Sequence, residues 1–176
     1  MSEAQKTAVI FGLANKRSIA WAIAQKLQQA GWRLAITYQN ERLALEAKDL
    51  IAELPGAAGF MFDVTQDDQI ARLFVELKEK YGVLHGLVHS IGFAPEADLK
   101  GEFVNTTREG FRIAHDISVY SLVAVSRAAA PLMAELVISL LVNLSARQRS
   151  NVVFTVTATE LRAVFPLVSV RVTRAV

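Results

Sequence analysis

Short apolar runs and helically spaced apolar residues alternate along the first part of this chain. The apolar run at residues 8–11 is short enough for a buried strand and ends at Gly12. Apolar residues then recur every three or four positions, at Ile19, Ile23, Leu27 and Ala30. This pattern predicts a strand, a turn and a helix, with Ser18 as the residue that caps the helix.

The same order of strand and helix repeats downstream. Apolar stretches at 32–38, 59–64, 83–91 and 137–145 predict four more strands. Amphipathic segments at 43–54, 65–81 and 106–133 predict the intervening helices, the second of them starting at Thr65 with Asp68 as its capping-box partner. Near-continuous apolar strands that alternate with helices indicate an α/β fold, a doubly wound parallel sheet covered on both faces. The long connection at 93–105 is expected to line a ligand site.

The pattern loosens after residue 145. Residues 151–159 and 168–173 have the composition of strands, but the segment between them is too short for a usual parallel crossover. Either the end of the chain is irregular or the sheet stops being doubly wound there. We expect a single domain over residues 1–176, with a regular part at 6–145 and an atypical tail at 146–176.

Composition and charge narrow the function. The 176 residues include no cysteine, which excludes a disulfide scaffold and a thiol nucleophile. The polar N-terminus does not resemble a signal peptide and no long apolar run is present, so a cytoplasmic protein without a membrane span is expected. The net charge of +2 comes from scattered arginines near the end, a pattern that does not favour nucleic-acid binding. The spacing of His85, His89 and His115 predicts no metal site, and we interpret each as a structural or surface histidine.

The turn after the first strand is a candidate phosphate site. A helix that begins near Ser18 directs its free N–H groups and the positive end of its dipole toward this turn. The usual fingerprint G-x-G-x-x-G is incomplete, because Asn15 or Ser18 occupies the later glycine positions. An ordinary strand-to-helix turn capped by Ser18 explains this one segment equally well.

Five segments taken together resemble a known family, and they occur in the same order and register. They are residues 12–24, 38–41, 63–64, 89–95 and 117–122. They are similar to the bacterial NADH-dependent enoyl-acyl-carrier-protein reductases, which belong to the short-chain dehydrogenase/reductase superfamily, and the resemblance extends from about residue 6 to residue 134. It implies a Rossmann-like fold and an oxidoreductase of fatty-acid biosynthesis that reduces the trans-2 double bond of enoyl thioesters on acyl-carrier protein. It also implies a homotetramer built in part by the long helix.

The resemblance also implies the residues that would contact the cofactor and the substrate. Gln39 is neither acidic nor basic, which favours NADH over NADPH, although Arg42 nearby could pair with a 2′-phosphate. Taken singly, residues such as Asp63 or Ser90 have equally good structural interpretations. The implied cofactor-binding residues are Gly12, Ala14, Ser18, Ile19, Gln39, Asp63, Val64, Ser90, Ile91 and Gly92, and the implied substrate-pocket residues are Phe93, Ala94 and Pro95.

The residues that perform the family's chemistry have no counterpart in this sequence. The resemblance implies a tyrosine that donates a hydrogen bond to the enolate and a lysine that holds the nicotinamide ribose, both after the fifth strand. Here Ala146 follows that strand, no tyrosine follows Tyr120, and no lysine follows Lys100. No catalytic residue is therefore assigned. A non-catalytic nucleotide-binding or interaction module, or a truncated product, remains the alternative.

The resemblance also implies a long helix after the fifth strand, which would carry this tyrosine and lysine and has no counterpart in the sequence. Without it, the strands at 83–91 and 137–144 would lose cover on one face and expose apolar surface. We therefore expect the chain to form oligomers through the predicted helix at 106–133 and this sheet face, or to aggregate.

Overall fold

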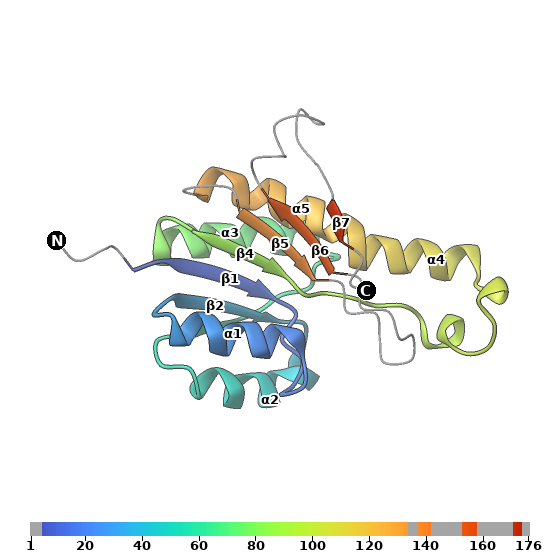
Figure 1. Cartoon of the computed structure of the whole chain (residues 1–176), viewed down its shortest axis with the longest axis horizontal. Coiled ribbons are helices and arrows are strands. Elements are labelled where there is room, and N and C mark those ends of the chain that lie inside the picture. Colours follow the sequence, from blue (N-terminus) through green and yellow to red (C-terminus); the bar gives the residue numbers. More distant parts are fainter. Residues whose placement is uncertain (1–4, 134–136, 142–152, 158–170, 174–176) are drawn as a thin grey trace.

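The computed structural model describes residues 5–133, 137–141, 153–157 and 171–173, which form one seven-stranded sheet in the order β3-β2-β1-β4-β5-β6-β7 (Figure 1). The first five strands in that order are parallel, and β6 and β7 are each antiparallel to the strand before them. The strands are β1 (Thr7–Phe11), β2 (Arg33–Tyr38), β3 (Ala58–Met61), β4 (Gly86–His89), β5 (Val137–Leu141), β6 (Val153–Thr157) and β7 (Arg171–Thr173).

Helices cover both faces of the parallel part. Helices α1 and α2 lie on one face, whereas α3 and the long segment that ends in α5 lie on the other (Figure 1). No helix in the described ranges is both long enough and apolar enough to cross a membrane. The helices are α1 (Ile19–Gln29), α2 (Glu41–Ala52), α3 (Asp67–Tyr81), η1 (Glu96–Leu99), η2 (Phe103–Asn105), α4 (Arg108–His115), the π-helical η3 (Asp116–Tyr120), α5 (Ser121–Ala129) and η4 (Ala130–Leu132).

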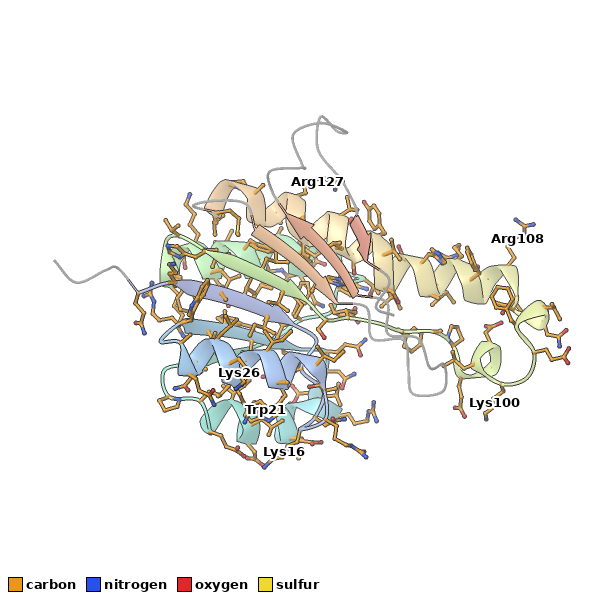
Figure 2. All side chains as sticks on the ribbon, viewed as in Figure 1. Lys16, Trp21, Lys26, Lys100, Arg108 and Arg127 are labelled. Atoms are coloured by element: carbon orange, nitrogen blue, oxygen red, sulfur yellow. The ribbon has the colours of Figure 1, made fainter. Side chains whose placement is uncertain are left out.

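The central strand β1 shows why the fold needs cover on both faces. All of its residues are buried, and the four apolar ones after Thr7 alternate between two apolar clusters. Ala8 and Ile10 pack with residues of α1 and α2, where Trp21 fills the space between these two helices (Figure 2). Val9 and Phe11 pack with residues of α3 and α5. The predicted doubly wound parallel sheet is confirmed for this part of the chain.

The helix starts agree with the predictions at one position and differ at another. Ser18 caps α1, and its Oγ accepts a hydrogen bond from the Trp21 N–H at 3.3 Å. The predicted cap at Thr65 is wrong, because α3 begins at Asp67. The Thr65 Oγ instead donates to Asp63 Oδ1 at 2.8 Å and accepts from the side-chain amide of Gln66 at 3.1 Å, so it is used within the turn before the helix.

The end of the chain follows one of the two expected alternatives. β6 runs antiparallel to β5, and β7 runs antiparallel to β6, so the sheet stops being doubly wound after β5. Most of the tail predicted to be atypical lies outside the described residues. The side chains of Leu87, Val88 and His89 in β4 are buried, contrary to the expectation that this strand would lose its cover, although Val83 before it is exposed. The same expectation for the strand at 137–144 concerns side chains outside the described residues.

Candidate functional site

A pocket lies at the edge of the sheet where β1, β2 and β4 reach their carboxyl ends. In the strand order β3-β2-β1-β4-β5, the winding direction reverses between β1 and β4, and open parallel sheets bind ligands at such a reversal. The pocket has a volume of about 200 Å³. It is lined by Gly12, Leu13, Ala14, Ser18, Thr37, Tyr38, Gln39, Leu43, Phe62, Val64, Ser90, Ile91, Gly92, Phe93 and Ile117.

Gly12 sets the distance between the ends of β1 and β4. Its φ of +97° lies in the left-handed region, and a Cβ at this position would stand 2.3 Å from the carbonyl oxygen of Ser90. The Ser90 N–H donates to the Phe11 carbonyl at 3.1 Å, so the two chain segments stay paired up to this point. A glycine is therefore required here by a backbone contact within the protein itself.

Side chains hold the turn that leads into α1. The Arg17 N–H donates to Asn15 Oδ1 at 2.8 Å, and Ser18 Oγ donates to the Asn15 carbonyl at 2.7 Å. Asn15 has a negative φ, so its own backbone conformation does not require a glycine. Of the first N–H groups of α1, that of Trp21 is taken by Ser18, whereas those of Ile19 and Ala20 have no partner in the described residues and are available to an anion.

The end of β2 contributes an aromatic ring and an exposed amide. Tyr38 is buried, whereas Gln39 is exposed and its Oε1 accepts a hydrogen bond from Asn40 Nδ2 at 3.4 Å. Asn40 in turn caps α2 by accepting from the Leu43 N–H. Arg42 is exposed in the first turn of the same helix.

Two of the three residues after β3 line the pocket. Phe62 and Val64 are buried and face it, but Asp63 does not. Asp63 Oδ1 accepts hydrogen bonds from both the N–H and the hydroxyl of Thr65, at 2.9 and 2.8 Å. This carboxylate therefore stabilises the turn before α3.

The segment after β4 is fixed by the π-helical segment η3. The Phe93 N–H donates to Ser118 Oγ at 3.0 Å, and Ser118 Oγ lies 3.1 Å from the Phe93 carbonyl, to which it donates. The Phe93 ring remains half exposed at the mouth of the pocket. Ile117, one residue before Ser118, contributes to the pocket wall.

The structure brings together most residues predicted for the site. Those that line the pocket are Gly12, Ala14, Ser18, Gln39, Val64, Ser90, Ile91, Gly92 and Phe93. Ile19, Asp63, Ala94 and Pro95 do not line it. Sequence reasoning missed Leu13, Thr37, Tyr38, Leu43, Phe62 and Ile117. Their position at strand ends is the signal that could have found Thr37, Tyr38 and Phe62. Leu13, Tyr38 and Ile117 lie in segments that carry the family resemblance but were given no role there.

The lining is nearly free of titratable groups. Tyr38 is the one titratable residue among the residues that line the pocket, and no carboxylate, lysine, arginine or histidine belongs to that set. The polar character of the site comes from backbone groups, hydroxyls and the Gln39 amide. Such a surface can bind and orient a ligand, but the described residues supply it with no evident acid or base.

A buried histidine lies directly behind the pocket. His89 Nε2 is 2.7 Å from Ser121 Oγ, and that hydroxyl donates to the Ile117 carbonyl at 2.6 Å, so the imidazole Nε2–H is the donor to the serine. His89 Nδ1 has no partner in the described part of the chain. Burial lowers the pKa of His89 to about 4. The other histidines are structural or exposed, since His85 accepts from the Thr7 N–H and His115 lies on the surface.

These features define a class of protein. A parallel sheet in the order 3-2-1-4-5, with a glycine turn that leads into a capped helix at the reversal point, is the Rossmann-like dinucleotide-binding architecture. The sequence profile described as Enoyl-(Acyl carrier protein) reductase matches residues 12–160. The chain belongs to the enoyl-acyl-carrier-protein reductase family, as the resemblance predicted.

The chain spans about half the length of the relatives that it matches. The NADH-dependent reductase FabI of Bacillus subtilis is 48% identical over 129 residues, which are 72% of this chain and 50% of that protein. The NADPH-dependent FabI of Staphylococcus aureus is 44% identical over 132 residues, covering 74% and 52%. The crystal structure of the Bacillus cereus reductase with NADP⁺ and indole naphthyridinone superposes with a TM-score of 0.75 at 44% identity, covering 82% and 58%.

Gly12→Ala tests the contact between the ends of β1 and β4. We expect the unfolding free energy to fall by roughly 1–3 kcal/mol, because the new Cβ meets the Ser90 carbonyl in a left-handed backbone. Gly31→Ala is the matched control, since its φ is +80° but a Cβ there meets nothing within 4 Å. Urea unfolding of both variants measures the difference. Equal losses would mean that the close approach adds nothing.

Stability should fall in acid because His89 is neutral in the fold. The unfolded imidazole binds a proton near its ordinary pKa of 6.5, whereas the folded one does so only near 4. As the pH falls through this window the unfolded state gains the proton first, so the unfolding free energy drops by about 3 kcal/mol in all. Urea unfolding at several pH values should show a smaller drop for His89→Gln than for the exposed control His115→Gln. Identical pH profiles for the two variants would contradict the assignment.

Proposed function

We propose that the pocket binds NADH. We also propose that this NADH-binding part belongs to an enzyme activity that reduces the trans-2 double bond of enoyl thioesters carried on acyl-carrier protein. The observation that carries the proposal is the cradle formed by the Gly12 turn and the start of α1 at the reversal point of the sheet. Family membership supports it, because relatives named for this reaction share about half of their length with the chain.

The residues at the pocket fit a nicotinamide dinucleotide. The N–H groups at the start of α1 suit the pyrophosphate, and Gln39 suits the adenosine ribose. Phe62 and Val64 offer an apolar surface for the adenine. Asp63 would hydrogen-bond the adenine with a carboxylate whose Oδ1 already accepts two hydrogen bonds from Thr65. The segment 90–92 suits the nicotinamide ribose, with Phe93 at the acyl end. When bound, the cofactor supplies the hydride for the β-carbon of the enoyl group.

Binding and reduction make different demands on this chain. Hydride addition leaves an enolate that needs a hydrogen-bond donor and nearby positive charge. Tyr38 lines the pocket on the proposed adenosine side, and Tyr120 is half exposed in η3 and outside the lining. No tyrosine follows Tyr120 and no lysine follows Lys100 in the sequence. We therefore propose that these 176 residues bind NADH but do not reduce the substrate on their own.

A non-catalytic nucleotide-binding module is the second candidate. The nearly uncharged lining of the pocket favours it, because binding through backbone groups needs no acid or base. This candidate predicts the same affinity for NADH, and it predicts no enoyl reduction under any condition.

A titration followed by an assay tests the proposal. NADH fluorescence should change saturably when the protein is added, and crotonyl thioester should then cause no loss of NADH absorbance. Absence of binding by either NADH or NADPH would overturn the proposal. Turnover at the rate of an ordinary reductase would overturn the claim that the chain lacks a functional proton donor.

Gln39→Arg tests the choice of cofactor. Wild-type protein should bind NADH more tightly than NADPH, and the variant should gain affinity for NADPH by about tenfold, because a guanidinium pairs with the 2′-phosphate. Gln29→Arg adds the same charge to an exposed position at the other end of α1 and should change neither affinity. Tighter NADPH binding by the wild type that is lost in Arg42→Gln would assign the ribose site to Arg42 instead.

Self-association is the partner interaction that the surface supports. Apolar side chains are exposed along the α4–α5 segment, each by 44–52%: Phe111, Val119, Tyr120 and Val123. We propose that this segment forms a contact between copies of the chain, because an apolar surface of this kind is stabilised by burial. Sedimentation at micromolar concentration should show oligomers, and Val123→Lys should shift them toward monomer. A wild-type monomer would contradict this interpretation.

A further inference from the structure

The long helical segment on one face of the sheet is interrupted at the pocket. Between α4 and α5, the π-helical segment η3 widens the helix, and the Ser121 N–H donates to the carbonyl of Asp116 five residues earlier. Insertions of this kind are costly within an α-helix and commonly occur at functional sites. Here the insertion carries Ile117, which is part of the pocket wall.

A side-chain hydrogen-bond chain connects η3 to the sheet. His89 at the end of β4 donates through Nε2 to Ser121 Oγ, and the serine donates to the carbonyl of Ile117. A serine that bonds back to the carbonyl four residues earlier bends a helix at that point. These two hydrogen bonds therefore join His89, the last residue of β4, to Ile117, the residue of η3 that lines the pocket.

His89 cannot act by contacting a ligand directly. Its side chain is fully buried and does not line the pocket, although Ser90, the next residue, does. Its one bonded ring nitrogen points to Ser121, and the other has no partner in the described residues. Among the described residues, the hydrogen bond to Ser121 is the contact through which the His89 side chain reaches η3 and the pocket wall.

We propose that His89 is a positioning residue, which acts through Ser121 to hold η3 so that Ile117 forms the pocket wall and the dinucleotide binds tightly. This inference rests on the proposed function. A neutral imidazole protonated at Nε2 is the form that this arrangement needs, and burial disfavours the charged form. Glutamine can place an amide donor in a similar position, so it should replace histidine in this role.

NADH titrations of a set of variants test the proposal. His89→Ala and Ser121→Ala should each weaken NADH binding by about tenfold, as expected when a buried hydrogen bond that positions a wall residue is lost. The double variant should bind no more weakly than either single variant, because both changes break the same chain of contacts. His89→Gln should restore affinity to near that of the wild type.

Two controls separate positioning from general loss of stability. Ser126→Ala removes a hydroxyl of α5 that has no partner in the described residues, and it should not change the affinity. Leu77→Met disturbs the fully buried core of α3 away from the pocket, and it should lower the melting temperature without weakening binding.

The outcomes distinguish this inference from the proposed function. If wild-type protein does not bind NADH, the proposed function fails. If it binds NADH and folded Ser121→Ala binds equally well, the positioning role is wrong. It is also wrong if Leu77→Met weakens binding in proportion to its lost stability, or if His89→Gln binds as weakly as His89→Ala.

Discussion

The close approach of Gly12 to the carbonyl of Ser90 is the constraint on which the rest of the site depends. It holds the carboxyl ends of β1 and β4 together at the point where the winding direction reverses. From this contact one segment continues into the turn before α1 and the other into the segment at 90–93. Both segments line the pocket, so its two principal walls are positioned by a single backbone contact that only glycine permits.

The alternation of buried residues explains why this edge of the sheet is well defined. β1 is buried on both faces, and its neighbours fix its register over several residues on each side. The segment that leaves β1 therefore begins at a well-defined position. Lys100 and Arg108, by contrast, lie on segments that project away from the sheet (Figure 2). The rigid part of the fold thus carries the candidate binding surface.

Local patterns in the sequence predicted the features that have local causes. The four strands and first three helices up to β4 followed from apolar spacing, whereas the short helices η1 and η2 were not predicted and the helix expected at 106–133 is divided into shorter segments. Ser18 was predicted as a cap because its hydroxyl bonds only three residues away. Thr65 was mispredicted as the cap because its Oγ is engaged within the preceding turn, where it donates to Asp63 and accepts from the side-chain amide of Gln66. The π-helical segment and the role of Ile117 depend on His89 and Ser121, which are 32 residues apart and leave no mark on the periodicity. The prediction of a homotetramer and the assignment of each residue to a part of NADH stay predictions.

Amide chemical shifts on addition of NADH test the central claim most directly, namely that this edge of the sheet holds a dinucleotide. The account predicts that the largest shifts fall on the turn and first helical residues at 12–20 and on the segment at 90–93, with smaller ones at 37–39. Shifts confined to the opposite edge of the sheet, around Gly31 and Gly82, or no shifts at saturating NADH, would contradict it.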